Sequence, residues 1–339
     1  MKVLVTGAAG FIGGYMVREL LRAGYDVVGL DNHSKYGPIR RAYDGEQRYR
    51  SVTGDAKDGA LLESLLEDCD YLVAGAAMIG GISYFHEFAY DLLAENERIA
   101  ASTFDAAIRA YRKGRLRKVT LLSSSMVFES ATAFPSREGD QINCPPPGST
   151  YGFQKLACEY FARGASEQYK LPYTIVRPFN CVGIGEGRAR SDREVLSGDI
   201  KLAMSHVVPD LVQKLVKGQD PLRILGSGNQ IRHYTYGGDL ARGIRACMEH
   251  PAALNEDFNL STSQGTTVLE LAATIWRKLR PDKTFRWVSD PAFKYDVQRR
   301  IPDVSKAKRL LGFECTTSLE QMLDEVIPWV KEQVVAGNI

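Results

Sequence analysis

The first half of the chain alternates short apolar runs with longer stretches whose apolar positions recur every three or four residues. Short β-branched runs are typical of strands buried on both faces of a parallel sheet, and the longer spacing is typical of amphipathic helices. The pattern predicts strands over residues 3–5, 25–30, 49–53, 71–75, 118–123 and 173–177. It predicts helices over residues 11–23, 58–67, 90–111 and 151–169. This alternation indicates an α/β fold, a doubly wound parallel sheet covered by helices on both faces.

The pattern changes beyond residue 178, where residues 183–205 are rich in Gly, Arg, Ser and Asp and indicate a long loop. Helices are then predicted over residues 207–217, 238–250, 267–279 and 318–335, and short strands over residues 222–225, 257–260 and 285–288. We expect residues 1–178 to form a dinucleotide-binding domain that carries the catalytic residues. Residues 179–339 should form mainly a smaller, mixed α/β substrate domain, with the chain able to cross between the two. Ligands should lie between them, beyond the carboxyl ends of the parallel strands.

The first predicted strand runs directly into Gly7, Gly10 and Gly13, and the second ends at Asp31. Glycines at this spacing permit a tight turn from strand to helix, with the backbone close enough to touch a pyrophosphate at the helix N-terminus. A carboxylate about 20 residues further on suits the adenosine ribose hydroxyls of NAD and repels the extra phosphate of NADP. The pattern therefore predicts a dinucleotide site that prefers NAD.

Composition narrows the class of protein. The chain has 339 residues, a formal net charge of +2 and 25% charged residues, a balance that argues against nucleic-acid or membrane-surface partners. No apolar stretch approaches the length of a bilayer-spanning helix. The six cysteines show neither Cys-x-x-Cys nor Cys/His spacing, so neither a disulfide framework nor a metal site is indicated. We expect a cytoplasmic protein with reduced thiols.

Two further segments turn a nucleotide-binding fold into an enzyme hypothesis. The fifth predicted strand leads into Ser124, and the helix over residues 151–169 places Tyr151 and Lys155 one turn apart. An ammonium beside a phenol favours the phenolate, which can take a proton from a sugar hydroxyl while the nicotinamide accepts a hydride from the same carbon. We therefore expect Tyr151 to be the base, Lys155 to tune it and Ser124 to anchor the hydroxyl.

These residues make the chain similar to the extended short-chain dehydrogenase/reductase family, and within it to the nucleotide-sugar epimerases and dehydratases. The resemblance covers nearly the whole chain and includes Gly54-Asp55 with Asp58, Ala74 to Ala77, Arg177-Pro-Phe-Asn180 and Gly226 to Arg232. It implies a Rossmann fold, a tightly bound and recycled NAD, a nucleotide-diphosphate sugar as substrate, and a homodimer formed through the helices over residues 90–111 and 151–169.

The resemblance also implies site residues. Besides the glycines, Asp31, Tyr151 and Lys155, the expected cofactor contacts are Phe11, Ile12, Asn32, Asp55, Ala56, Ala76 and Asn96. The expected substrate contacts are Ser125, Met126, Asn180, His206, Val207, Arg232 and Arg299. The charged loop residues expected to set substrate specificity are Arg188, Arg190, Asp192, Arg193 and Glu194.

The residues after Ser124 bear on the reaction. In the sugar 4,6-dehydratases of the family an Asp-Glu pair eliminates water at that point, whereas this chain has Ser125 and Met126. The resemblance therefore favours 4-epimerisation of a nucleotide-linked hexose or uronic acid through a transient 4-keto sugar.

Two alternatives remain open. Residues 77–82 and 205–209 look like segments of the GDP-fucose synthases and GDP-mannose 3,5-epimerases, which would allow a GDP-sugar 3- and/or 5-epimerase or a 4-keto-sugar reductase using His206. The other alternative is a non-catalytic cofactor- or RNA-binding member of the same fold.

Overall fold

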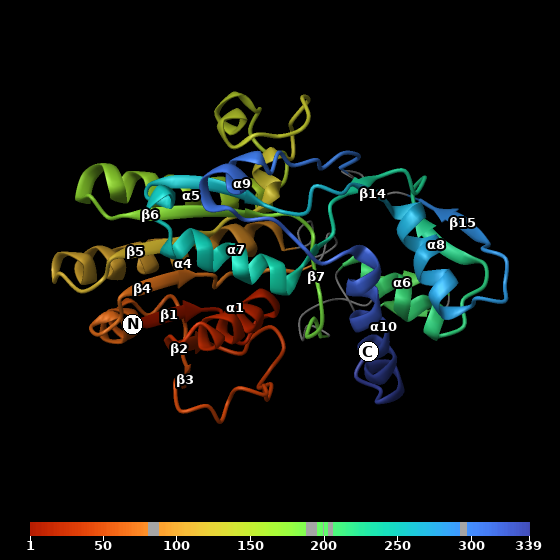
Figure 1. The fold of residues 1–339 in the computed structure, drawn as a ribbon, viewed down its shortest axis with the longest axis horizontal. Helices are drawn as coiled ribbons and strands as arrows, with labels where there is room; N and C mark the ends of the chain where they lie inside the picture. The colour runs from red at the N-terminus through yellow and green to blue at the C-terminus, as the bar shows by residue number, and fades with distance from the viewer. Residues whose placement is uncertain (81–87, 188–194, 199, 203–205, 292–296) are drawn as a thin grey trace.

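Seven parallel strands form one sheet, in the spatial order β13-β6-β5-β4-β1-β2-β3 (Figure 1). The arrangement comes from a computed structural model that describes residues 1–80, 88–187, 195–198, 200–202, 206–291 and 297–339. The strands are β1 (Lys2–Thr6), β2 (Asp26–Asp31), β3 (Tyr49–Thr53), β4 (Tyr71–Ala74), β5 (Lys118–Leu122), β6 (Tyr173–Pro178) and β13 (Glu256–Leu260). The predicted doubly wound parallel sheet is confirmed.

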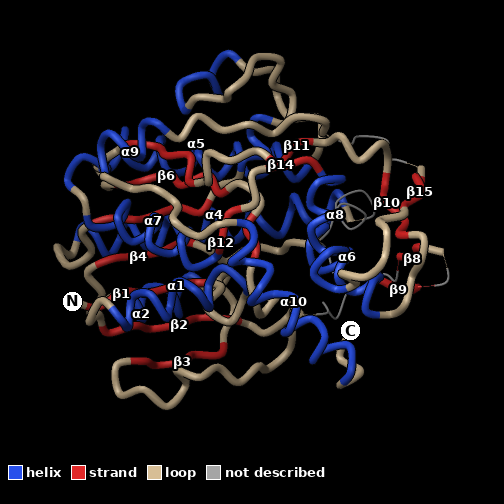
Figure 2. The backbone as a smooth tube through the Cα atoms, turned by 45° about the vertical axis from the view of Figure 1, so that its right-hand side comes forward, coloured by secondary structure: helices blue, strands red, loops and turns tan. Residues whose placement is uncertain are grey.

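Helices cover both faces of this sheet because successive residues of a buried strand point to opposite sides. Val3 and Val5 of β1 belong to the core under α1 (Phe11–Arg22) and α7 (Gly237–Glu249), which pack side by side in Figure 2. Leu4 belongs to the core on the other face. The helices over that face are α2 (Gly59–Leu66), α4 (Ala89–Arg112) and α5 (Thr150–Tyr169).

The strand predicted over residues 257–260 lies in this main sheet. As β13 it pairs in parallel with β6, Phe258 opposite Val176. Together with α7 and α9 (Ser305–Leu311), it brings the chain back to the first part of the molecule after residue 178. The division of the chain into domains at residue 178, with a chain that crosses between them, stays a prediction.

The second part of the molecule has its own core, formed by α6 (Val207–Val216), α8 (Val268–Leu279) and α10 (Leu319–Val335) around β10 (Leu222–Leu225). Strand β10 pairs with β15 (Trp287–Asp290), two residues later than the strand predicted there. Four other short strands form two-residue pairs: β7 (Cys181–Val182) with β12 (Thr235–Tyr236), and β11 (Ile231–Arg232) with β14 (Thr266–Thr267).

Part of the segment predicted as a loop over residues 183–205 is a hairpin. Strands β8 (Val195–Ser197) and β9 (Ile200–Leu202) pair antiparallel, and Gly198 between them has a φ of +63°. Strands this short contain too few alternating positions to give a period that sequence analysis can detect. The remaining short elements are the 3-10 turns η1 (Ser125–Phe128), η2 (Glu138–Asn143) and η3 (Pro251–Ala253).

A buried ion pair links the sheet to α5. Arg177 of β6 donates to both carboxylate oxygens of Glu159 on α5, at 2.8 and 2.7 Å, and both side chains have 0% exposure. Arg177 also contacts Asp257 of β13 at 2.8 Å. Burial alone would raise the pKa of Asp257, but Arg177 and Lys306 hold it below its usual range. The guanidinium therefore joins three elements at one buried point.

Replacing Arg177 with Met keeps the length of the side chain and removes its charge. Two carboxylates then lose their buried partner, which should lower the free energy of unfolding by about 3–5 kcal/mol. Urea denaturation of the variant measures this loss, with the exposed Arg309→Met as the matched control. An Arg177→Met protein as stable as the Arg309→Met control would contradict the prediction.

Candidate active site

A cavity of about 840 Å³ runs from the carboxyl ends of the sheet strands to the second part of the molecule. Its walls include the turns after β1, β2, β4 and β5, the start of α5, and residues of α6, β10 and β11. The cavity therefore lies where the parallel strands end, as the sequence predicts.

The glycine turn forms one end of this cavity. Gly7 has a φ of +75°, and a Cβ at Gly13 would lie 2.0 Å from the carbonyl oxygen of Gly7. Gly10 is the N-cap of α1 and makes no side-chain hydrogen bond there, so the first N–H groups of this helix have no capping oxygen from that residue. The turn leaves room for an anion against the backbone and the helix N-terminus.

Asp31 fixes the shape of this turn. Its carboxylate accepts hydrogen bonds from the backbone N–H groups of Ala9, at 3.0 Å, and His33, at 2.8 Å. The side chain still lines the cavity, where carboxylate oxygens have further lone pairs for ribose hydroxyls. Nearby, the Asn32 amide donates to Asp55 at 3.2 Å. The glycine turn and the helix N-terminus fit the pyrophosphate of NAD, and the acidic strand end fits its adenosine ribose.

The other expected cofactor residues divide into two groups. Phe11, Ile12, Ala56 and Ala76 line the same cavity. Asn96 does not line it; its side-chain amide accepts from the Met78 N–H at 2.7 Å and donates to the Met78 carbonyl at 2.9 Å. Asn96 therefore orients the backbone that follows β4.

The three expected catalytic residues meet on the same cavity. Ser124, Tyr151 and Lys155 all line it, with exposed fractions of 9%, 7% and 7%. The Ser124 hydroxyl accepts from the Met126 N–H at 3.2 Å, and the Lys155 ammonium donates to the Leu122 carbonyl at 3.2 Å. These contacts hold the serine and the lysine at the end of β5.

Glu129 supports this site and was missed in the sequence. Its carboxylate accepts from the Ser149 N–H at 2.8 Å, and the Ser149 hydroxyl in turn caps α5 by accepting from Gly152 at 3.0 Å. Glu129 thereby fixes the start of the helix that carries Tyr151. The sequence gives no sign of this contact, because Glu129 and Ser149 are 20 residues apart and only the fold brings them together.

Six of the seven expected substrate residues line the cavity: Ser125, Met126, Asn180, His206, Val207 and Arg232. Asn180 stands out because it has a φ of +38° and a buried Oδ1 without a hydrogen-bond partner. Left-handed backbone at a residue other than glycine is typical of ligand sites.

The seventh, Arg299, lies outside the cavity lining, and its neighbour Arg300 lies within it. Arg299 forms a backbone bridge with Ile231, whereas the Arg300 guanidinium lies 2.8 Å from the Met126 sulfur. Neighbouring residues of an extended segment point to opposite sides, so the sequence could not decide between two adjacent arginines.

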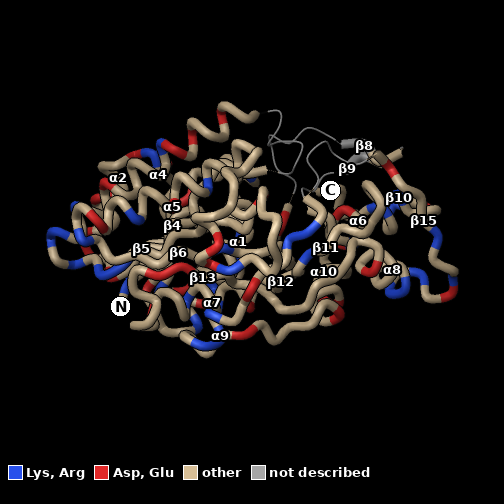
Figure 3. Tube along the Cα trace, turned by 90° about the horizontal axis from the view of Figure 1, so that it is seen from above, with Lys and Arg blue, Asp and Glu red and all other residues tan. Residues whose placement is uncertain are grey.

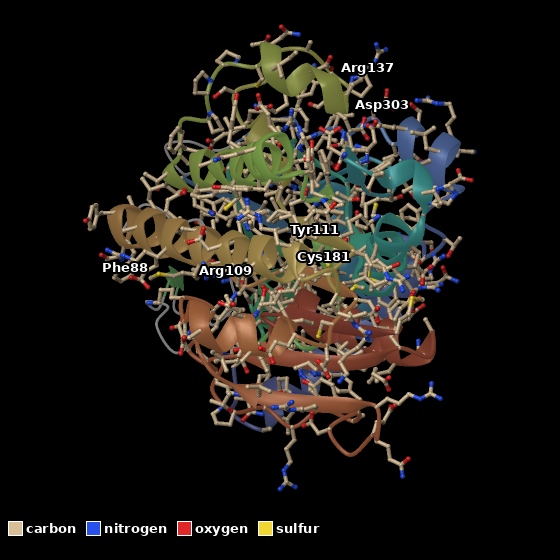
Figure 4. The ribbon with its side chains drawn as sticks, turned by 90° about the vertical axis from the view of Figure 1, so that its left-hand side faces the viewer. Phe88, Arg109, Tyr111, Arg137, Cys181 and Asp303 are labelled. Atoms are coloured by element: carbon tan, nitrogen blue, oxygen red, sulfur yellow. The ribbon has the colours of Figure 1, made fainter. Side chains whose placement is uncertain are left out.

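The segment that carries Arg300 is tied to the first part of the molecule. Ser136 donates to the Ile301 carbonyl at 2.8 Å, and Arg137 contacts Asp303 at 3.4 Å. Figure 4 shows Arg137 and Asp303 close together at one edge of the molecule. These contacts place the arginine segment beside the loop that follows η1.

The second end of the cavity contains a pair of side chains, of which the sequence predicted only His206. His206 contacts the carboxylate of Glu186 through Nδ1, and both residues line the cavity. Burial alone would raise the pKa of Glu186, but His206 lowers it below its usual range. Two further charged residues of α6 that the sequence did not single out, Asp210 and Lys214, line this end as well.

Residues 183–187, which we call the cofactor strap, lie against Tyr15 of α1 and against Arg41. The Ile184 N–H donates to the hydroxyl of Tyr15 on α1 at 2.9 Å. A Cβ at Gly185 would lie 2.7 Å from the Arg41 guanidinium, which donates to the Ala9 carbonyl at 3.0 Å. The strap is therefore attached to the same loop that forms the dinucleotide site.

The expected specificity residues Arg188, Arg190, Asp192, Arg193 and Glu194 lie outside the described residues, as do Gly81, Ile82 and Ser205. Within the described part of the chain, no helix is both long enough and apolar enough to cross a bilayer. The six cysteines are free thiols. Basic and acidic residues are interspersed over both parts of the molecule in Figure 3.

Comparison with known proteins places this site in a family. Residues 3–261 match the NAD dependent epimerase/dehydratase family. The chain belongs to this epimerase/dehydratase family. Its NAD dependence confirms the cofactor predicted from the glycine turn and Asp31, and membership of an enzyme family argues against the non-catalytic alternative.

Individual relatives within the epimerase/dehydratase family differ in reaction. A UDP-glucose 4-epimerase of Lactobacillus helveticus is 26% identical over 93% of this chain and 92% of its own length. A UDP-N-acetyl-alpha-D-glucosaminuronate decarboxylase of Bacillus cytotoxicus is 27% identical over 98% of both chains. The crystal structure of a Thermotoga maritima UDP-glucose 4-epimerase with UDP-glucose has a TM-score of 0.82 and 27% identity, covering 98% of this chain and 100% of that chain.

Replacing Gly13 with Ala should abolish NAD binding, because the new Cβ would meet the Gly7 carbonyl oxygen at 2.0 Å and open the turn. The NAD content of the purified protein, measured after denaturation, tests this. Gly164→Ala is the control, since a Cβ at that helical position meets nothing within 4 Å. Normal NAD content in the Gly13→Ala protein would refute the assignment of the turn.

Proposed function

We propose that the protein is an NAD-dependent nucleotide-sugar 4-epimerase. The observation that carries the proposal is the convergence of Ser124, Tyr151 and Lys155 on the cavity that contains the dinucleotide turn, with Met126 beside them. The two positions after Ser124 are Ser125 and Met126, and neither side chain supplies a carboxylate for eliminating water. The site supports oxidation at one carbon and reversal of that oxidation.

Bound NAD supplies the acceptor for a hydride from the sugar. Tyr151 takes the proton of the 4-hydroxyl, the Lys155 ammonium stabilises the phenolate that this requires, and Ser124 donates a hydrogen bond to the sugar oxygen as it becomes a carbonyl. After the keto sugar rotates, the same hydride would return to the opposite face of that carbon, and Tyr151 returns the proton to the oxygen. The net change is inversion at one carbon, with cofactor and protein restored.

Two arginines support a diphosphate in the middle of the cavity. Arg232 of β11 and Arg300 both line it, and guanidinium groups form paired hydrogen bonds with phosphate oxygens. The Arg300 contact with Met126 keeps this charge next to the catalytic serine. The substrate would then extend from Tyr151 past the arginines to the α6 end.

The expected homodimer also belongs to the proposal. Aromatic side chains on the outer surfaces of α4 and α5 are exposed: Tyr90 by 77%, Phe153 by 48% and Tyr160 by 63%. Exposed aromatic residues on adjacent helices are typical of a surface that another protein covers.

Tyr151→Phe removes one oxygen and leaves the packing in place. Incubation with a panel of UDP-, GDP-, dTDP- and CDP-linked hexoses and uronic acids should give inverted sugar with the wild type and a loss of about 10²–10⁴-fold with the variant. Nuclear magnetic resonance of the products is the readout. Unchanged turnover by the variant, or release of carbon dioxide from the uronic acids, would overturn the proposal.

A second candidate, a 3- or 5-epimerase, is favoured by one observation, the contact between His206 and Glu186 on the cavity wall. Such a pair could exchange a proton beside a 4-keto group. Running the same panel in heavy water separates the candidates, because deuterium enters carbon 3 or 5 only if that exchange occurs. Inversion at carbon 4 without deuterium supports the leading proposal.

A 4-epimerase must keep its cofactor through both halves of the reaction, and the cofactor strap gives a structural reason for retention. Tyr15→Phe removes the hydroxyl that holds the strap at Ile184. Losing one hydrogen bond should speed NAD release by about three- to tenfold. Stopped-flow dilution into an NAD scavenger measures the rate, and Tyr25→Phe, which loses a hydrogen bond to Glu249, is the matched control. Equal release rates for the two variants would refute this role.

A further inference from the structure

The end of the cavity formed by α6 contains an acidic side chain with one buried oxygen that accepts no hydrogen bond. Asp210 lines the cavity, and its Oδ1 is buried with no hydrogen-bond partner. An acidic residue in the first turn of a helix is favoured by the helix dipole, but the dipole does not explain a buried oxygen that accepts no hydrogen bond. Leaving such an acceptor unsatisfied is unfavourable.

The groups around Asp210 act on its pKa in opposite directions. Burial raises its pKa well above the usual range; Lys214 opposes that shift and Glu186 adds to it. Hydrogen-bond donors from a ligand would stabilise the carboxylate and lower the pKa again. Among the described residues no donor reaches Oδ1 of Asp210, so the position is suited to a ligand that brings one.

Lys214 lies one turn further along α6 and lines the same end of the cavity. Its side chain is 3% exposed and its ammonium donates to the Arg223 carbonyl of β10 at 2.9 Å. An ammonium has three donors, and this hydrogen bond uses one of them. An acceptor and a donor are therefore presented side by side on one helix face.

Apolar residues complete the walls around this pair. Ile224 and Leu225 of β10 line the cavity there, with Leu211 of α6 and Val268 at the start of α8. Apolar walls with a few placed polar groups suit a planar ring whose edge carries donors and acceptors. In a nucleotide-diphosphate sugar, the nucleobase is the part with that chemistry.

We propose that Asp210 and Lys214 read the base of the substrate, and that this base is guanine. Guanine presents two adjacent N–H donors, at N1 and N2, next to the O6 acceptor. A carboxylate accepts from both donors, while an ammonium donates to O6. Uracil and thymine place a single N–H between two carbonyl oxygens, which would face the carboxylate unfavourably. The inference rests on the proposed nucleotide-sugar substrate.

Calorimetric titration of the NAD-loaded protein with GDP, UDP, dTDP, CDP and ADP tests the base directly. GDP should bind at least about tenfold more tightly than UDP, since a bidentate base contact discriminates by about 1–3 kcal/mol. UDP is the important competitor because the relatives named above act on UDP-sugars. Equal or tighter binding of UDP would overturn the inference.

Asp210→Asn gives a sharper test, because the amide replaces one acceptor with a donor. Xanthine has a carbonyl at the carbon that carries the amino group of guanine, so the variant should lose at least about tenfold in GDP affinity and gain affinity for XDP. Asp105→Asn, the same change on an exposed position of α4, is the control and should leave both affinities unchanged. Unchanged GDP affinity in the Asp210→Asn protein would overturn the inference.

The outcomes separate this inference from the proposed activity. Binding of free nucleotides needs no turnover, so GDP preference and the shift to XDP support the inference even if no sugar in the panel is inverted. Inversion of UDP-sugars alone, with GDP binding no better than UDP, supports the activity and overturns the base assignment. The wild-type ranking of nucleotides decides the matter if the Asp210→Asn protein fails to fold.

Discussion

The arrangement of the site depends on the buried pair of Arg177 and Glu159. Both side chains are fully buried, and Ser123, which precedes the proposed catalytic residue Ser124, donates to the same carboxylate at 2.6 Å. One glutamate thus fixes the end of β5, the helix that carries Tyr151 and the strand that leads to Asn180. A buried ion pair contributes little net stability over apolar packing, but it tolerates only one geometry. The buried pair thus helps to place the residues proposed to be catalytic, together with the contacts that Leu122, Met126 and Glu129 make around them.

Local patterns predicted much of the molecule. The glycine turn, Asp31, the Tyr151 helix and six strands of the sheet could be recognised because each depends on residues near one another in sequence. The partner of β13 could not be recognised, because an isolated apolar run does not indicate which sheet it joins. Arg300 and Tyr15 were missed for a related reason. The orientation of Arg300 depends on a bridge to Ile231, and the function of Tyr15 on a contact 169 residues away.

The two ends of the cavity are built on different principles. At the cofactor end, backbone groups and glycines define the shape, and few side chains could change without closing the turn. At the α6 end, side chains such as Glu186, His206 and Lys214 define the chemistry, and the backbone only presents them. A single fold can therefore retain NAD while its substrates diverge, which agrees with relatives that share the fold and differ between epimerisation and decarboxylation.

The cofactor strap connects these two ends. Ile184 is held by a helix of the cofactor half, and two residues later Glu186 contacts His206 at the start of α6. One short segment therefore contacts both α1, which follows the glycine turn, and α6, which lines the other end of the cavity. If the proposed epimerisation is the reaction, this connection is useful, because loss of substrate or cofactor would interrupt it at the ketone. The strap lies outside the sheet, and the buried Arg177–Glu159 pair joins the sheet to the helix that carries Tyr151.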